Sequence, residues 1–166
     1  MVGVKMGAIA DYGALVEAVD SQKRRLQGPP QPDLWGGDIA KRFRADPKRQ
    51  MEDSFEALAE LVRPDDVFVD AGGGAGRFSL PMALRCRQAI NVDPSAGMGQ
   101  EFEKSAAEAG IENASFVLSD WLDVDGVQGD VALAAHVTYF VSDIQRFIAK
   151  LKGAARRRVI INLSSI

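Results

Sequence analysis

Residues 67–77 read VFVDAGGGAGR, a short apolar run that ends in an acid and leads into a turn with four glycines. An apolar run of this length is typical of a buried strand. Glycines after it let the backbone turn tightly and let a ligand approach the main chain. A tight turn without a ligand is the alternative, but four glycines in five positions favour a ligand loop. The stretch therefore predicts a strand, a ligand-binding turn and a helix.

The alternation of strand and helix continues along the rest of the chain. Short apolar strands that alternate with amphipathic helices predict an α/β fold, a doubly wound and mostly parallel sheet with helices on both faces. Ligands of such sheets bind beyond the carboxyl ends of the strands. Further strands are predicted over 89–93, 114–118, 130–135 and 158–163, and helices over 8–26, 48–62, 77–84, 95–109 and 142–151.

The glycine turn departs from two common nucleotide-binding motifs. A dinucleotide fingerprint needs Gly-x-Gly-x-x-Gly, and its third glycine would fall on Arg77 or Ser79. A P-loop is excluded because no Gly-Lys-Ser/Thr follows. Asp70, directly before the turn, would repel a pyrophosphate and suits a ligand with an amino group. These details argue against a nicotinamide-dependent oxidoreductase.

From about residue 65 to 163 the sequence resembles the class I S-adenosylmethionine-dependent methyltransferases, which have a Rossmann-like fold. Residues 67–76 look like the family's first motif, an acid followed by Gly-x-Gly-x-Gly, and residues 90–95 are similar to its second motif. The resemblance implies that the glycine loop packs against the methionine part of the cofactor, with an acid near its amino group. An acid at the end of the second strand then binds both ribose hydroxyls. The implied cofactor-binding residues are Asp70, Gly72, Gly74, Gly76, Asp93, Pro94, Ser95, Asp120, Trp121 and His136.

Residues 116–121 match the family's third element, in which an acidic or polar residue contacts the adenine amino group. Asp120 fits that role, and Trp121 can lie against the purine. For Asp120 the alternative is a solvated loop acid or a helix cap. For Trp121 the alternative is core packing.

His136 is the single histidine and follows the fourth predicted strand, where the family places residues beside the transferred methyl group. An imidazole can accept a proton near neutral pH, so His136 is predicted as a general base or as a contact on the methyl side of the cofactor. The Asn/Asp-Pro-Pro-Tyr/Phe motif of amino-methylating DNA and protein-glutamine enzymes is missing here. We therefore expect a methyltransferase that acts on O or N of a small molecule. A non-catalytic S-adenosylmethionine-binding, nucleoside-binding or interaction domain is the alternative.

Residues 1–63 precede the predicted sheet and are expected to form a helical lid or cap, with the Rossmann-like domain over 64–166. The breaker GPPQP at 28–32 separates a first helix from the rest, and Asp46 and Pro47 are expected to begin the second. In many small methyltransferases such helices fold over the cofactor. The predicted substrate-side and lid residues are Trp35, Phe43 and Tyr139.

The composition excludes several kinds of protein. The chain has 166 residues, 46% of them hydrophobic and 26% charged, which suits one globular domain. A net charge of −3 argues against a nucleic-acid partner. One cysteine and one histidine exclude a disulfide framework and a Cys/His zinc site, so no metal is expected. No apolar run is long enough to span a membrane and no signal peptide is present, so we expect a cytoplasmic protein without a membrane partner.

The sequence ends directly after its fifth predicted strand, whereas the family's domain normally continues with a helix and an antiparallel hairpin. We therefore expect a five-stranded sheet that lacks this hairpin, in a truncated or naturally short member. The apolar fifth strand, with three arginines (156–158) expected beside it, would be an exposed edge. Pairing of that edge with a second copy predicts a homo-oligomer.

Overall fold

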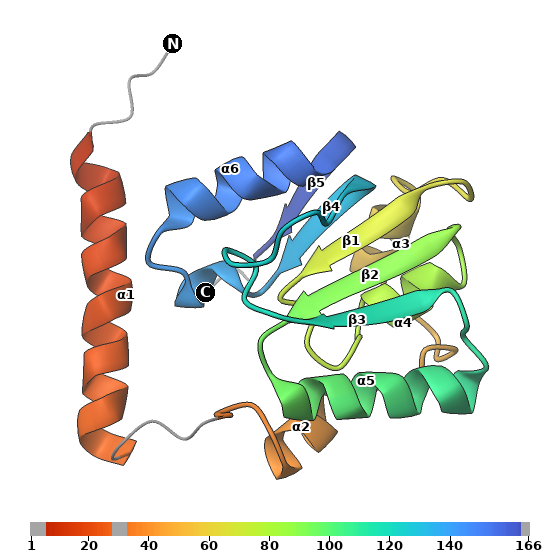
Figure 1. Cartoon of the computed structure of the whole chain (residues 1–166), viewed down its shortest axis with the longest axis horizontal. Helices are drawn as coiled ribbons and strands as arrows, with labels where there is room; N and C mark the ends of the chain where they lie inside the picture. Colours follow the sequence, from red (N-terminus) through yellow and green to blue (C-terminus); the bar gives the residue numbers. More distant parts are fainter. Residues whose placement is uncertain (1–5, 28–32, 164–166) are drawn as a thin grey trace.

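The computed structural model describes residues 6–27 and 33–163, so the predicted breaker at 28–32 lies outside the described residues. Five parallel strands form one sheet in the order β3-β2-β1-β4-β5 (Figure 1). This confirms the predicted α/β fold with a doubly wound parallel sheet. The strands are β1 (Val67–Ala71), β2 (Gln88–Asp93), β3 (Ala114–Leu118), β4 (Gly129–Ala135) and β5 (Ala155–Asn162).

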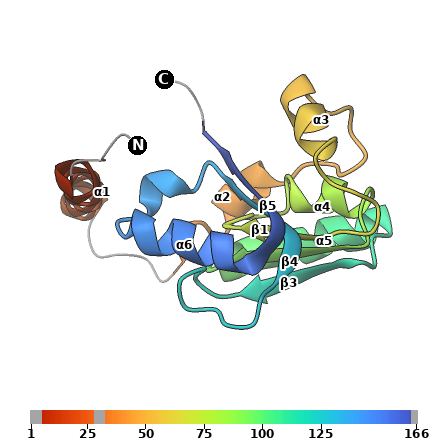
Figure 2. The same ribbon diagram turned by 90° about the horizontal axis from the view of Figure 1, so that it is seen from above.

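Helices cover both faces of the sheet, and each face has its own apolar cluster (Figure 2). On one face Phe68 of β1 packs with residues of α3, α4 and α5, among them Leu80 and Phe102. On the other face Val69 packs with α6, through Leu151 and its neighbours. The helices are α1 (Met6–Gln27), α2 (Asp38–Phe43), α3 (Asp53–Ala59), α4 (Ser79–Ala83), α5 (Ala96–Ala109) and α6 (Ile144–Ala154), with a 3₁₀ turn η1 (Thr138–Phe140).

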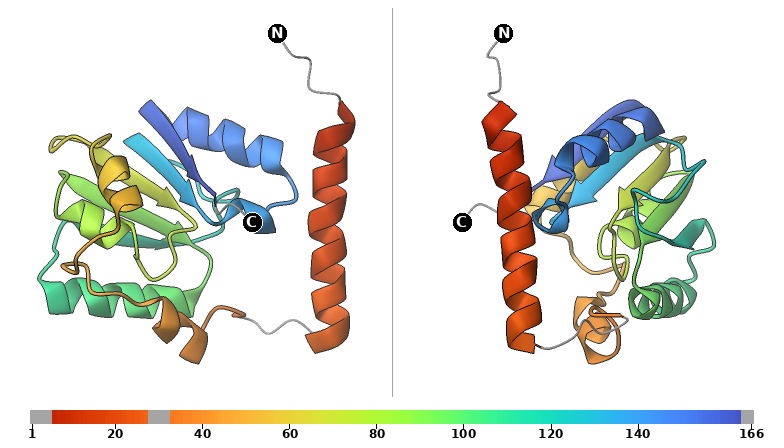
Figure 3. Two further views of the ribbon diagram at one scale, coloured as in Figure 1. Left: turned by 180° about the vertical axis from the view of Figure 1, so that it is seen from behind. Right: turned by 60° about the vertical axis from the view of Figure 1, so that its left-hand side comes forward.

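The long helix α1 confirms the first predicted helix and stands on the side toward which the strands point (Figures 1 and 3). The Tyr12 hydroxyl donates a hydrogen bond to the carbonyl of Thr138 in η1. Val16 is buried, whereas Leu15 and Leu26 are exposed. A few contacts therefore join α1 to the segment that follows β4.

The second predicted helix is wrong at both ends. The sequence pattern predicts residues 48–62, but α3 begins at Asp53 and ends at Ala59. The Asp46 carboxylate accepts a hydrogen bond from the N–H of Lys48 at 2.8 Å, which closes a local turn of the kind that short polar side chains favour. Asp46 thus begins a turn and not a helix.

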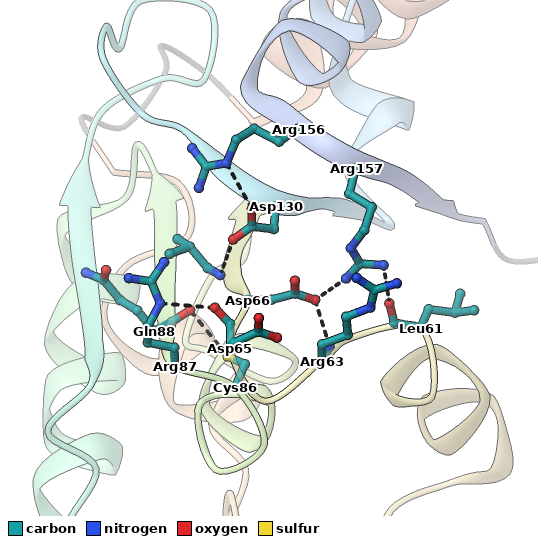
Figure 4. A network of polar contacts seen from close by, with 11 residues as sticks. Leu61, Arg63, Asp65, Asp66, Cys86, Arg87, Gln88, Asp130, Arg156 and Arg157 are labelled. Atoms are coloured by element: carbon teal, nitrogen blue, oxygen red, sulfur yellow. Dashed lines mark hydrogen bonds and ion pairs between the residues drawn. The ribbon is translucent and has the colours of Figure 1, made fainter.

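The fifth strand also begins earlier than predicted, at Ala155 rather than Arg158. The arginines that were expected beside the strand lie within it, and two of them have acidic partners, one on β4 and one directly before β1 (Figure 4). Arg156 Nε donates to Asp130 at 2.9 Å, and Arg157 donates to Asp66. These contacts join the start of β5 to the start of β1.

Asp66 is the buried member of this network, and we expect its substitution to cause a large loss of stability. Its carboxylate accepts from the N–H of Arg63 at 2.7 Å and from Arg157, and the residue is 4% exposed. Asp66→Ala should lower the free energy of unfolding by about 2–4 kcal/mol, because it leaves a partly buried guanidinium unpaired. Urea denaturation measures the change. Glu56→Gln, which breaks an exposed ion pair with Arg85, should cost much less, and equal losses in the two variants would contradict this account.

At the edge of the sheet, β5 leaves Ile161 and Leu163 exposed. The structure therefore confirms the predicted edge position of this strand, while pairing with a second copy stays a prediction. Among the described residues, no helix combines the length and apolar character needed to cross a bilayer.

Candidate functional site

A cavity of about 410 Å³ lies at the carboxyl ends of β1 and β4, where the strand order reverses. This is where open α/β sheets bind ligands, and the volume suits a small molecule or cofactor. Ten of the predicted site residues line it: Trp35, Phe43, Asp70, Gly72, Gly74, Asp93, Pro94, Asp120, Trp121 and His136.

The glycine loop forms the floor of the cavity, and each of its alternate glycines has a positive φ: 76° at Gly72, 54° at Gly74 and 86° at Gly76. A Cβ at Gly72 would lie 2.4 Å from Val137, and one at Gly76 would lie 2.6 Å from Phe102. These two glycines allow close packing within the protein, and Gly76 does not line the cavity. A Cβ at Gly74 would meet only the Met98 side chain, at 3.6 Å. Gly74 is therefore the position where a ligand can approach the backbone.

Asp70 lies beneath this loop and is fully buried. Neither of its carboxylate oxygens has a hydrogen bond of standard geometry, although Ser79 lies close enough to lower its pKa in part. Burial and, secondly, the charge of Asp93 raise the pKa of Asp70 to about 7. A buried carboxyl held in this way is suited to a cationic ligand group, which would stabilise its ionised form.

Asp93 ends β2 and fixes the loop against the start of α5. Its carboxylate accepts from the N–H of Gly74 at 3.0 Å and from the N–H of Ser95 at 2.9 Å. Burial raises its pKa, and these two hydrogen bonds oppose that rise. Ser95 itself caps α5, accepting from the N–H of Met98 at 3.1 Å, and does not line the cavity. Lone pairs on Asp93 remain for a polyol at this wall.

Asp120 and Trp121 follow β3 and line the cavity as predicted. The Asp120 carboxylate accepts from the N–H of Leu122 at 2.7 Å, so the residue also closes its own turn. Trp121 is 3% exposed and belongs to the core cluster under α6, while its indole N–H has no hydrogen-bond partner in the described structure. Trp121 therefore both packs in the core and lines the wall of the cavity.

His136 has a left-handed backbone, with φ 57°, which is uncommon for a residue with a Cβ. Its N–H donates to the carbonyl of Asn162 at 3.0 Å, which joins the ends of β4 and β5. The exposed ring lies 6.3 Å from the ring of Phe78. Backbone strain of this kind concentrates at functional sites, and here it directs a titratable ring to the end of the cavity.

Three aromatic side chains from distant segments form the rim. Trp35 contacts Phe43 with ring centroids 5.8 Å apart and Phe140 with centroids 5.5 Å apart, both edge to face. All three line the cavity, and two of them, Trp35 and Phe43, are among the three predicted substrate-side and lid residues. Tyr139 contacts Phe140 but is not a lining residue.

Sequence reasoning missed several residues of the site. Asn91 is buried within β2 and donates to the carbonyl of Gly74 at 3.0 Å. Its polar side chain in an otherwise apolar strand could have indicated this role in the sequence. Asp33 accepts from the N–H of Gly97 at 2.8 Å and so fastens the segment before Trp35 to α5. No sequence pattern indicated Asp33. Neither Asn91 nor Asp33 lines the cavity itself, and the lining residues that were not predicted include Arg77, Phe78, Val92, Met98, Val137 and Phe140.

The cavity is acidic overall. Four carboxylates line it against a single arginine, Arg77, and they are Asp70, Asp93, Asp120 and Asp143. A positively charged ligand therefore fits the site better than a phosphate.

Comparison with known proteins decides the family. Residues 69–161, more than half of the chain, match the family described as "Methyltransferase domain". The chain belongs to the class I S-adenosylmethionine-dependent methyltransferase family. A protein of Methanococcus maripaludis described as a candidate S-adenosylmethionine-dependent methyltransferase has the same fold, with a TM-score of 0.67 and 16% identity over 80% of this chain and 66% of that one. Magnesium protoporphyrin IX methyltransferase of Synechocystis, crystallised with S-adenosylmethionine, has a TM-score of 0.60 and 19% identity, over 97% of this chain and 77% of that one.

Two curated relatives match parts of this methyltransferase. The 23S rRNA (uracil(1939)-C(5))-methyltransferase RlmD of Xanthomonas campestris is 37% identical over 65 residues, 39% of this chain and 15% of that protein. An uncharacterized protein of Haemophilus influenzae is 30% identical over 102 residues, 60% of this chain and 38% of that protein. The chain thus spans well under half the length of the relatives it matches.

The family uses S-adenosylmethionine as its cofactor, and the residues present in this chain fit it. An unpartnered buried carboxylate at Asp70 suits its ammonium group, and the open space at Gly74 suits a ligand against the backbone. Asp93 is placed for its ribose hydroxyls, and the acidic lining suits its positively charged sulfur. Bound here, the cofactor supplies a methyl group that is activated for transfer by that sulfonium.

The pKa of Asp70 predicts that cofactor binding depends on pH. Since this pKa is raised to about 7, binding of an ammonium group next to Asp70 must release a proton below pH 7. The affinity for S-adenosylhomocysteine should rise by up to about tenfold per pH unit toward pH 7 and then level off. Calorimetry from pH 5.5 to 8 measures this, and Asp70→Asn should flatten the profile. A flat profile in the native chain would contradict the role of Asp70.

Proposed function

We propose that the protein transfers a methyl group from S-adenosylmethionine to an oxygen or nitrogen of a small molecule. The observation that carries the proposal is a second cavity of about 850 Å³ that shares His136 with the cofactor cavity. A bounded space next to the site of the methyl group favours an acceptor that enters as a whole molecule.

In this function the chain's main task is alignment of two reactants, because the methyl group is already activated. His136 lies between the two cavities, where it can take the proton that the acceptor loses when it gains the methyl group. Trp35 and Phe43 at the rim exclude water from the cofactor, and residues 1–63 act as the lid that carries them. A cytoplasmic location fits this proposal.

RNA methylation is the second candidate, favoured by the likeness of 65 residues to RlmD, whose name gives a uracil of 23S rRNA as its target. A net charge of −3 weighs against an RNA-binding face on this chain. A non-catalytic cofactor-binding domain is the third candidate.

A transfer assay separates these functions. The chain is incubated with S-adenosylmethionine that carries a radioactive methyl group, together with either a pooled extract of metabolites or total RNA. Label in the metabolite fraction is the expected result. Label in RNA alone would replace the proposal by the second candidate. No label in either, from a chain that binds S-adenosylhomocysteine by calorimetry, would favour the non-catalytic domain.

A further inference from the structure

The charges of the two neighbouring cavities have opposite signs. The second cavity borders the first through four shared residues, Phe43, Arg77, Phe78 and His136. Whereas carboxylates dominate the first, the second has four arginines and a single acid, Glu52, in its lining. The arginines come from α2, from the segments after it and from the glycine turn: Arg42, Arg44, Arg49 and Arg77.

Two of these arginines, Arg49 and Arg77, lie beside each other, and the acids Glu52 and Asp46 are near them. Arg49 is half-buried, and its guanidinium donates to the backbone carbonyls of Asp46 at 3.0 Å and Arg77 at 3.2 Å. Burial and, secondly, the charge of Arg77 lower the pKa of Arg49. The nearest acid to Arg77 is Glu52, at 3.7 Å, and both side chains are largely exposed. By contrast, Arg44 is already engaged by Glu108 and by the hydroxyl of Ser105.

Holding two guanidinium groups together costs free energy that a bound anion recovers, because an anion between them replaces repulsion with charge-assisted hydrogen bonds. Guanidinium groups suit planar carboxylates and phosphates in particular. The rest of the lining combines aromatic rings, among them Phe43 and Phe78, with polar side chains such as Gln50, Ser54 and Asn162. Phe78 stacks on the buried Phe55, with 6.1 Å between the ring centroids. The combination of an arginine pair and an aromatic wall defines what this space can hold.

We infer that the second cavity is the acceptor site and that it takes a small molecule with a carboxylate or phosphate beside an apolar or aromatic body. Arg49 and Arg77 bind the anionic group, Phe78, which stacks on the buried Phe55, contacts the body, and His136 faces the atom to be methylated. This inference rests on the proposed function. A small molecule is favoured over an RNA because the arginines line one bounded cavity of a chain that is acidic as a whole.

The test uses the full chain saturated with S-adenosylhomocysteine and three probes of similar shape: phenyl phosphate, benzoate and the neutral benzamide. Binding is followed by chemical-shift changes of backbone amides. At least one anionic probe should shift the amides of Phe43, Phe78 and His136, with an affinity at least about tenfold above that of benzamide. The anion that binds more tightly indicates whether the acceptor carries a phosphate or a carboxylate. Equal binding of all three probes, or binding of none, would overturn the inference.

Arg49→Gln should weaken the anionic probe by about tenfold or more and leave the affinity for S-adenosylhomocysteine unchanged, since Arg49 does not line the cofactor cavity. Arg87→Gln is the matched control. It removes the same charge from a side chain that also donates to a backbone carbonyl, that of Asp65, and it should change neither affinity. Equal weakening by both variants, or tighter binding of a single-stranded RNA than of the probes, would overturn the inference. Loss of S-adenosylhomocysteine binding in the native chain would instead count against the proposed function.

Discussion

Gly74→Val is expected to weaken binding of S-adenosylhomocysteine by at least about 100-fold, a change of about 3 kcal/mol. The chain at this position has φ 54°, and the only atoms that a Cβ would meet within 4 Å belong to Met98. The added side chain therefore fits against the protein but occupies the space that faces the cavity. The backbone N–H of residue 74, which donates to Asp93, would also shift as the loop leaves the left-handed region. Calorimetric titration measures the loss.

Gly110→Val is the control for backbone strain alone. Gly110 ends α5 with φ 68°, and a Cβ at this position would meet no atom within 4 Å. Both substitutions force a branched side chain into a left-handed backbone and should cost similar stability, of the order of 1–2 kcal/mol. Only Gly74→Val should lose the ligand. If the two variants lost affinity equally, or if Gly74→Val unfolded the chain as seen by circular dichroism, the loop would be mainly structural.

The strands of the sheet could be predicted because each is marked by a short apolar run in the sequence. Each of the first four predicted strands lies within one residue of the observed bounds at either end. Apolar runs that are buried on both faces need no partner elsewhere in the sequence to be recognised. The acids at the ends of β1 and β2 were found for the same reason, since they directly follow such runs.

The errors arise where a residue's partner is far away in the sequence. The start of β5 depends on Arg156 and Arg157, which find Asp130 and Asp66 across the sheet, and a run of three arginines alone does not predict a strand. The second helix was misplaced because Asp46 forms a local hydrogen bond that competes with helix capping. In both cases tertiary or local contacts overrode the propensity of the segment.

The site residues divide in the same way, into those in short sequence motifs and those that meet only in the folded chain. Residues within a short motif, such as Gly74 in the first motif and Asp93 in the second, were predicted from sequence and line the first cavity. The arginines of the second cavity were not, because Arg49 and Arg77 are separated by 28 positions and meet only through the fold. Sequence patterns thus indicated residues that line the first cavity, whereas the arginines of the second cavity became apparent only in the structure.

Asp93→Ala is expected to weaken binding of S-adenosylhomocysteine by at least about 100-fold. Two charge-assisted hydrogen bonds to ribose hydroxyls, each about 1.5–3 kcal/mol, would be lost together. The variant also frees the N–H groups of Gly74 and Ser95, which Asp93 holds, so part of the loss comes from a looser loop. Calorimetry measures the total. Asp143→Ala is the charge-matched control: Asp143 lines the same cavity and caps α6 through the N–H of Arg146, and its removal should change the affinity little.

A ligand that lacks one hydroxyl separates the ribose contact from the loop contact. In the native chain, the 2′-deoxy form of S-adenosylhomocysteine should bind at least about tenfold more weakly than the parent ligand. In Asp93→Ala the two ligands should bind alike, because the group that distinguishes them is gone, and the difference between the chains is the coupling energy of carboxylate and hydroxyl. If the parent ligand kept its full advantage in Asp93→Ala, Asp93 would act on the loop alone and another residue would bind the ribose.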